Sequence, residues 1–227
     1  MDARFRDARA GTERLDARGH VPRHRHRDAY AAIVLAGGYE EAGDGGRWLV
    51  APGHVLIHDR LEAHQDRIGV KGCTLVNVAL PAGAPIAGLF RIDDPDAVAR
   101  LAETDVPAAL ACLFAQPRQA VAPLTDWPDL LARRLAVDES LAIGVWAEEM
   151  GLAAESVSRG FRRAYGVTPR RYRLEARARR ALGMIGDCRM SLAAIAQECG
   201  FADQPHLTRT LSSITGRTPG QWVKSVQ

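Results

Sequence analysis

Histidine is concentrated in one part of the 227-residue chain. Six of the seven histidines lie between residues 20 and 64: His20, His24, His26, His54, His58 and His64. His24 and His26 are separated by one residue, so on a β-strand both side chains point to the same face. Imidazole suits zinc, copper, iron and nickel. The pattern therefore favours a divalent-metal site, and leaves open that these histidines line an organic-ligand pocket or a wet surface.

The C-terminal part of the chain contains an internal repeat. Residues 166–169 (Gly-Val-Thr-Pro) recur 50 positions later as residues 216–219 (Gly-Arg-Thr-Pro), and Gly151-Leu152 recurs as Gly200-Phe201. Each copy predicts a helix, a glycine-containing turn and a second helix, which is the arrangement of the helix-turn-helix motif. The predicted segments are 143–150, 151–153 and 154–165 in the first copy, and 192–199, 200–202 and 204–214 in the second.

Base recognition by such a motif uses exposed side chains near the start of its second helix. In the first copy, Val157 and Phe161 are spaced i, i+4 and should face the core. In the second copy, Leu207, Leu211 and Ile214 form the apolar stripe. Arginine can bind guanine in a bidentate manner and glutamine can do so with adenine. The outward side chains, which we predict to contact DNA, are Glu155, Ser156, Ser158, Arg159, Arg163, Gln204, His206, Thr208 and Arg209.

A helix predicted from about residue 169 to residue 185 connects the two copies. It carries six arginines: Arg170, Arg171, Arg173, Arg177, Arg179 and Arg180. We expect some of them to be solvated or to pair with Glu175, and others to contact phosphates, which supply affinity without sequence information. Residues 126–227 hold 15 basic and 11 acidic residues, within a formal net charge of +3 for the chain. This local surplus favours an acidic partner such as nucleic acid.

The preceding region predicts the elements that position the histidines. Residues 20–90 consist of short aliphatic runs separated by glycine and proline turns, a pattern typical of an antiparallel sandwich or barrel. Strands are expected at 29–35, 47–50, 54–58 and 73–80, with turns at 37–38, 43–46 and 52–53. Residues 94–116 change to a helical pattern that is broken into two helices near Asp105. The Pro- and Ala-rich stretch 116–126 is predicted to be a linker.

Composition excludes several classes of protein. Hydrophobic residues make up 47% and charged residues 25%, as in soluble globular proteins. No apolar run approaches the ~20 residues that a membrane-spanning helix needs. The charged N-terminus lacks the apolar segment of a secretory signal. The four cysteines show no CxxC spacing, so we expect reduced thiols in the cytoplasm.

The C-terminal sequence resembles the AraC/XylS family of transcription regulators. The likeness covers about residues 127–226 and is carried by residues 166–172, 192–204 and 216–222, of which the second stretch contains the family signature. It implies two helix-turn-helix units joined by one long helix, with recognition helices for successive major grooves. Leu211, where the family usually has Phe, and Pro205, which lacks a backbone donor, are departures. The likeness implies base-reading roles for Glu155, Ser158, Arg159, Gln204, His206, Thr208 and Arg209.

The N-terminal histidines resemble the two motifs of the cupin barrel. Gly19 precedes His24-Arg25-His26, and Pro52-Gly53 precedes His64. The likeness implies a divalent-metal site at His24, His26 and His64. In cupin enzymes the matching histidines bind the metal together with a glutamate about four residues further on, a place that Tyr30 takes here. AraC-type regulators often carry such a domain, and commonly keep these histidines without metal. The likeness therefore implies a sensor domain and leaves its ligand open.

These patterns predict an α+β protein with two domains. The first is a cupin-like β-barrel or sandwich, and the second is an all-α domain with two helix-turn-helix units joined by a long helix. The predicted boundaries are 1–92 for a cupin-like sensor domain, 93–125 for a helical dimerisation or linker region, and 126–227 for an AraC-type DNA-binding domain.

The predicted function is that of a sequence-specific DNA-binding transcription regulator without catalytic activity. Its N-terminal domain is expected to sense a small molecule or a metal, with zinc, iron, copper or nickel as the metals considered. The expected partners are double-stranded promoter DNA, RNA polymerase, the effector and a second copy of the chain, in the cytoplasm and away from membranes. Two alternatives remain: a metal-dependent cupin enzyme fused to a DNA-binding module, and a DNA-binding protein whose N-terminal domain only oligomerises.

Overall fold

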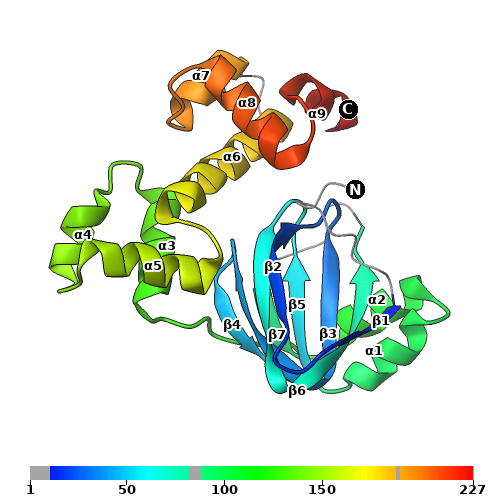
Figure 1. Cartoon of the computed structure of the whole chain (residues 1–227). Coiled ribbons are helices and arrows are strands. Elements are labelled where there is room, and N and C mark those ends of the chain that lie inside the picture. The colour runs from blue at the N-terminus through cyan, green and yellow to red at the C-terminus, as the bar shows by residue number, and fades with distance from the viewer. Residues whose placement is uncertain (1–10, 82–87, 188–189, 227) are drawn as a thin grey trace. The chain divides into compact units, whose positions relative to one another are not determined.

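The computed structural model describes residues 11–81, 88–187 and 190–226 (Figure 1). Two compact units are distinguished by their internal contacts: Met1–Asp129 with the short segment Ala164–Gly166, and Leu130–Arg163 with Val167–Gln227. The first ten residues of the predicted sensor domain and Cys188 lie outside the described residues. The other three cysteines are free thiols. Within the described ranges, no helix has the length and apolar character needed to cross a membrane.

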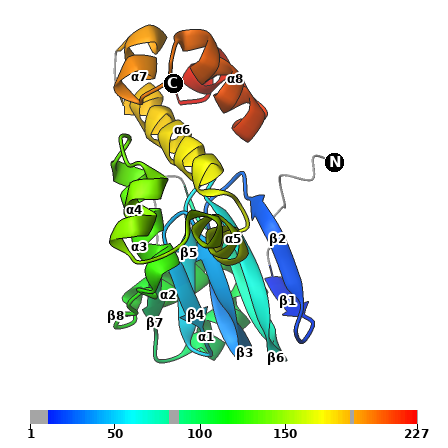
Figure 2. The same cartoon turned by 60° about the vertical axis from the view of Figure 1, so that its left-hand side comes forward.

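The first unit is built on an antiparallel sheet. Its strands are β1 (Gly11–Leu15), β2 (His20–Arg25), β3 (Tyr30–Gly43), β4 (Arg47–Val50), β5 (His54–His58), β6 (Ala63–Ala79), β7 (Gly88–Arg91) and β8 (Gln119–Ala120). Their order is β1-β6-β3-β5-β7-β8, with β2 also paired to β6 and β4 to β3. The two longest strands, β3 and β6, pair from Tyr30 opposite Ala79 to Gly43 opposite His64, and run side by side in Figure 2.

The prediction of a turn at Gly37 and Gly38 is wrong, because both residues lie inside β3. Their φ angles are 72° and 156°, and the β3–β6 register shifts between Gly37 and Tyr39. A side chain at Gly37 would collide with the carbonyl of Gly72, and one at Gly38 with the carbonyl of Val50. The two glycines therefore form a bulge where neighbouring backbones approach closely, which bends a long strand instead of ending it.

Two short helices cover part of the sheet. Helix α1 (Pro95–Ala102) and helix α2 (Val106–Ala115) are each N-capped by an aspartate side chain, from Asp94 and Asp105. This confirms the predicted break near Asp105. Val98, Ala109 and Leu113 are buried among aliphatic side chains of the sheet. The expected linker 116–126 is partly structured instead, because β8 pairs with β7.

The second unit is helical. Its elements are α3 (Trp127–Val137), α4 (Ile143–Glu149), α5 (Ala154–Tyr165), α6 (Pro169–Asp187), α7 (Leu192–Glu198), α8 (Gln204–Thr215) and α9 (Pro219–Val226), although a few residues of α3 and α5 group with the first unit. Gly151 and Gly200 have φ angles of 65° and 69°, as the turns of the two motifs require. The Asp203 side chain accepts a hydrogen bond from the His206 amide and caps α8. The helix pairs predicted from the repeat are confirmed.

An aromatic residue supports each helix-turn-helix pair at an equivalent place of the repeat. Phe161 of α5 lies edge-on to Tyr172 of α6, with ring centroids 5.4 Å apart. In the second copy, Trp222 of α9 donates from Nε1 to Thr215 Oγ1 at 3.0 Å. Both Tyr172 and Trp222 are buried. The helix that follows each recognition helix therefore supplies part of its apolar support.

Candidate functional site

The recognition helices α5 and α8 separate apolar and polar side chains as predicted. Val157 and Phe161 in α5 and Leu207 and Leu211 in α8 are fully buried. In α5, all five predicted contact residues are exposed: Glu155, Ser156, Ser158, Arg159 and Arg163. In α8, Gln204 and Arg209 are exposed, whereas His206 and Thr208 are half-buried.

The start of α8 differs from that of α5. The His206 ring lies edge-on to Phe201, with centroids 5.2 Å apart, so part of the imidazole supports the turn. Pro205 lies in the first helical turn, where backbone N–H groups have no partner within the helix. Proline therefore costs α8 no internal hydrogen bond. Gln204 and Arg209 are the α8 side chains with the greatest freedom to reach a base edge.

The arginines of the connecting helix α6 are largely engaged within the helical unit. Arg171 pairs with Glu175 at 2.7 Å, as anticipated for that glutamate. Arg177 Nη1 donates to the Gly200 carbonyl at 2.9 Å, and Arg180 donates to the Glu198 carbonyl. Arg180 also pairs with Glu139 at 3.1 Å. Arg177, Arg180 and Glu139, which we call the α7 clamp, therefore hold the C-terminal end of α7 instead of presenting all their donors to phosphate.

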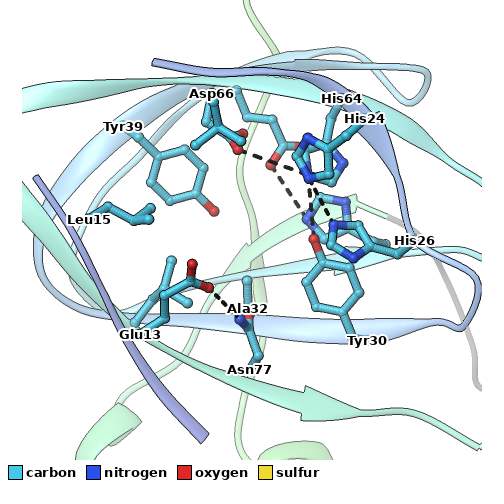
Figure 3. Close-up of a pocket in the computed structure, with 14 residues that line it drawn as sticks. Glu13, Leu15, His24, His26, Tyr30, Ala32, Tyr39, His64, Asp66 and Asn77 are labelled. Carbon is cyan, nitrogen blue, oxygen red and sulfur yellow. Dashed lines mark hydrogen bonds and ion pairs between the residues drawn. The ribbon is translucent and has the colours of Figure 1, made fainter. Parts of the chain in front are cut away.

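The second candidate site is a cavity inside the sheet unit (Figure 3). Cross-strand pairing gathers its polar side chains, since His24 of β2 lies opposite His64 of β6, and Tyr30 of β3 lies opposite His58 of β5. His26 follows the end of β2. His24 Nε2 and His26 Nε2 are 2.9 Å apart, and a ligand atom from each of His24, His26 and His64 lies within 4.8 Å of the others. The structure thus brings the three predicted histidines together.

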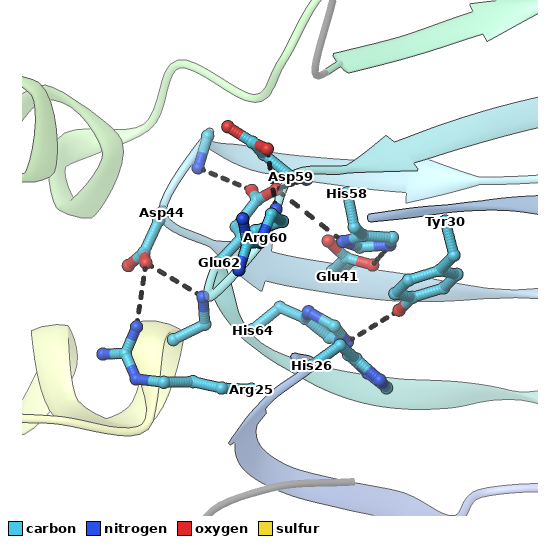
Figure 4. Close-up of polar contacts among 12 residues, drawn as sticks. Arg25, His26, Tyr30, Glu41, Asp44, His58, Asp59, Arg60, Glu62 and His64 are labelled. Atoms are coloured by element: carbon cyan, nitrogen blue, oxygen red, sulfur yellow. Dashed lines mark hydrogen bonds and ion pairs between the residues drawn. The ribbon is translucent and has the colours of Figure 1, made fainter. Parts of the chain in front are cut away.

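Two cavity residues were not predicted as part of this site. Glu41 Oε2 lies 3.4 Å from His58 Nε2, and together with His64 they form a second group whose ligand atoms lie within 4.8 Å of one another (Figure 4). The cupin pattern places a glutamate where this chain has Tyr30. Glu41 reaches the site from the other end of β3, where it pairs with Asp66. The sequence shows His58 as one of six clustered histidines, but it does not show that His58 lies opposite Tyr30 on the neighbouring strand.

Burial controls the protonation of this cavity. Burial lowers the pKa of His58 and of His64 well below the usual value, and neighbouring histidines lower it further. Both rings are therefore neutral at pH 7, with a lone pair available on one nitrogen each. Burial raises the pKa of Glu41 well above its usual value, and Asp66 and Glu62 add to this shift. Neutral imidazoles beside a carboxyl that can lose its proton form a site able to accept a cation.

The remaining lining restricts what the cavity can hold. The volume of the cavity is about 40 Å³. Because one water needs roughly 10–15 Å³ of such space, the cavity suits an ion with a few waters or a very small molecule. Glu13 accepts a hydrogen bond from Asn77 at 3.1 Å on one side of it. None of the described lining residues is Lys or Arg. An organic anion would therefore find no side-chain countercharge there.

Comparison with known proteins addresses the helical unit. A family model described as "Helix-turn-helix domain" matches residues 146–225. Over 76 residues the chain is 33% identical to the virulence regulon transcriptional activator VirF of Yersinia enterocolitica. These two matches support the resemblance of the helical unit to the AraC/XylS family. The VirF alignment covers 34% of this chain and 28% of VirF, so this relative is matched over less than a third of its own length.

Solved structures of AraC-type proteins are also similar to this chain. Apo ToxT K231A from Vibrio cholerae covers 96% of this chain and 100% of its own length, with 9% identity and a TM-score of 0.46. An AraC-type regulator from Chromobacterium violaceum covers 43% of this chain and 85% of its own length, with 26% identity and a TM-score of 0.38. Both TM-scores are low, so the resemblance to AraC/XylS regulators rests on the match over residues 146–225.

Proposed function

We propose that this chain is a sequence-specific DNA-binding transcription regulator of the AraC/XylS family with a sensor domain at its N-terminus. The carrying observation is that two helix-turn-helix pairs bury their apolar stripes and leave polar side chains exposed along the second helix. Double-stranded promoter DNA is the partner that such helices fit. RNA polymerase is the further partner expected of a regulator, and the cytoplasm is the compartment where both are reached. Membership of a regulator family favours regulation over catalysis.

We assign base reading to the exposed side chains of both recognition helices, led by Arg159 and Arg209. Each arginine can bind guanine O6 and N7 in a bidentate manner, and a good pair of this kind contributes about 1–3 kcal/mol of discrimination. Arg163 lies one turn further along α5 and is assigned a phosphate contact. The other assigned contact residues are Glu155, Ser156, Ser158, Gln204, His206 and Thr208.

The experiment first selects preferred duplexes from randomised DNA with the full chain, and then measures affinity by fluorescence anisotropy. Arg159→Ala and Arg209→Ala should each weaken specific binding by roughly 10- to 100-fold, and should change binding to unrelated DNA far less. Arg100→Ala is the matched control, because Arg100 is exposed on α1 in the other unit. Equal losses on all sequences would reduce these arginines to phosphate contacts, and failure to select any sequence would contradict the proposal.

A homodimer is part of the proposal, and α2 supports it. The ten residues of this helix, Val-Pro-Ala-Ala-Leu-Ala-Cys-Leu-Phe-Ala, carry no charge, although Pro107, Ala111 and Ala115 are exposed. A helix that is apolar on all sides is usually buried. Sedimentation of the full chain should show a dimer that Ala111→Glu dissociates and Thr104→Glu does not, since Thr104 is exposed outside the helix. A monomer at micromolar concentration would contradict this part of the proposal.

A further inference from the structure

We propose that the histidine-lined cavity binds a divalent transition-metal ion, and that Glu41 and His58 are ligands of this ion in addition to the predicted histidines. The metal assignment names the effector class of the proposed sensor, and rests on that function only for its regulatory consequence. The binding itself is argued from the two ligand groups that share His64.

The hydrogen bonding of His24 prepares one ring nitrogen for a metal. His24 Nδ1 lies 2.9 Å from the carbonyl oxygen of Pro22. A carbonyl oxygen only accepts, so this contact places the proton on Nδ1 and leaves a lone pair on Nε2 when the ring is neutral. Nε2 is the atom that faces His26 in the cavity. Metal-bound histidines characteristically donate their other N–H to a carbonyl or carboxylate in this way, which fixes the ring for the ion.

The second ligand group contains buried polar atoms that the fold itself does not satisfy. Among the described residues, Glu41 Oε1, His58 Nδ1 and His64 Nδ1 make no hydrogen bond, although Glu62 Oε2 lies 3.9 Å from His58 Nδ1. These three side chains are at most 2% exposed. Buried polar atoms normally find a partner in the protein or in ordered solvent. Three such atoms belong to side chains that line one small cavity, which favours a bound species there.

The charge of the lining selects a cation. The cavity is lined by four histidines and three carboxyl groups, those of Glu13, Glu41 and Asp66. No Lys or Arg is among the described lining residues. Arg23 and Arg25, which flank His24 in sequence, pair with Asp44 (Figure 4 shows Arg25 and Asp44). A cation would be attracted to the carboxyl groups, whereas an anion would be repelled once any of them ionises.

The donor set selects a transition metal over calcium or magnesium. The two groups together offer four imidazoles and one carboxylate. Calcium and magnesium prefer oxygen ligands instead. Imidazole with a carboxylate suits zinc, iron, nickel and cobalt. Glu41 thus supplies the carboxylate that is missing near Tyr30, from a strand position eleven residues further along the chain.

The test is direct titration of chelator-treated full chain with Co²⁺, followed by absorption, and with Zn²⁺, followed by calorimetry. The wild type should bind about one equivalent per chain. His64→Ala should abolish binding, because His64 belongs to both groups. Glu41→Gln and His58→Gln should each weaken binding by roughly 10-fold or more and change the Co²⁺ spectrum. No binding by the wild type would overturn the proposal.

Two control variants keep the ligand assignment falsifiable. Glu13→Gln changes a carboxyl of the same cavity outside both ligand groups, and His54→Asn changes a half-buried histidine on the same strand as His58. Both controls should bind metal as the wild type does. If Glu41→Gln and His58→Gln also bind like the wild type, these two residues are not ligands. Thermal unfolding separates misfolding from ligand loss, since metal should raise the Tm only of chains that bind it.

A DNA-binding assay separates this inference from the proposed function. Specific DNA affinity is measured with chelator and with Zn²⁺ at saturation. A bound metal that leaves DNA affinity unchanged would keep the ligand assignment and overturn metal sensing. If the chain binds specific DNA but takes up no metal, the proposed regulator function stands and the proposed metal site is overturned.

Discussion

The cavity and the recognition helices handle polar side chains in opposite ways. In the cavity, Glu41, His58 and His64 are almost completely buried, and each unsatisfied polar atom costs about 1–3 kcal/mol. On α5, Arg159 and its polar neighbours are exposed and cost folding almost nothing. The cavity therefore keeps polar side chains in place at a cost in folding stability. In the recognition helices, a separate apolar stripe stabilises the fold and the polar side chains do not. Changes in function and in stability should therefore be coupled in the cavity and separable on the helices.

The largest expected effect tests that separation on α5. Phe161→Ala removes a fully buried ring that packs on Tyr172, and should destabilise the helical unit by about 3–5 kcal/mol. Arg159→Ala, two residues away on the exposed face, should change stability by less than about 0.5 kcal/mol. Urea unfolding followed by circular dichroism measures both. A large loss of stability in Arg159→Ala would show that the two faces of α5 are not independent.

The next effect tests the cost of a buried carboxyl near the cavity. Burial raises the pKa of Glu62 to about 7, although the amides of Gly45 and Asp59 donate to the carboxyl. The folded chain therefore keeps a proton that the unfolded chain releases near pH 4.5. The stability contributed by this proton is present at low pH and is lost as pH rises through about 7.

Relative to Glu62→Gln, the wild type should lose about 2–3 kcal/mol of unfolding free energy between about pH 5 and pH 8. Denaturant unfolding of both chains at several pH values, in the presence of a chelator, measures the difference. Parallel pH profiles would show that the Glu62 carboxyl already ionises at its ordinary pH in the folded chain.

The smallest effect concerns the α7 clamp, which is polar and partly exposed. Arg180 and Glu139 are 43% and 35% exposed, so their mutual interaction should contribute about 0–1 kcal/mol in a double-mutant cycle with Glu139→Gln. Because Arg180 is held by the α7 end, Arg180→Ala should leave the salt dependence of DNA binding unchanged. Loss of one phosphate contact would instead reduce the slope of log K against log salt by about 0.9. That reduced slope would place Arg180 on DNA.

The helical unit was predictable because its signals are local. The turn glycines and the Asp203 cap each act within a few residues of the helix end that they define, and the repeat shows the same local pattern twice. The predicted apolar stripe containing Val157 and Phe161 was therefore placed correctly from periodicity alone.

The histidine site was predictable only in part because strand register is not local. The one-residue spacing of His24 and His26 predicts that both side chains lie on one face of a strand. Glu41 reaches the cavity only through register shifts in β3, one of them between Gly37 and Tyr39. The sequence predicted a turn at Gly37 and Gly38, which would have ended the strand before Glu41. His58 likewise joins the site through its pairing with Tyr30 across two strands.

The paired aromatic supports at Tyr172 and Trp222 have an evolutionary consequence. Each helix-turn-helix pair has an aromatic residue of its own from the helix that follows, although α6 also contacts α7, α8 and α9 of the second copy. A duplicated reader built in this way can drift in one copy while the other keeps its target. Half of an operator can then change by small steps, and selection can act on one recognition helix at a time.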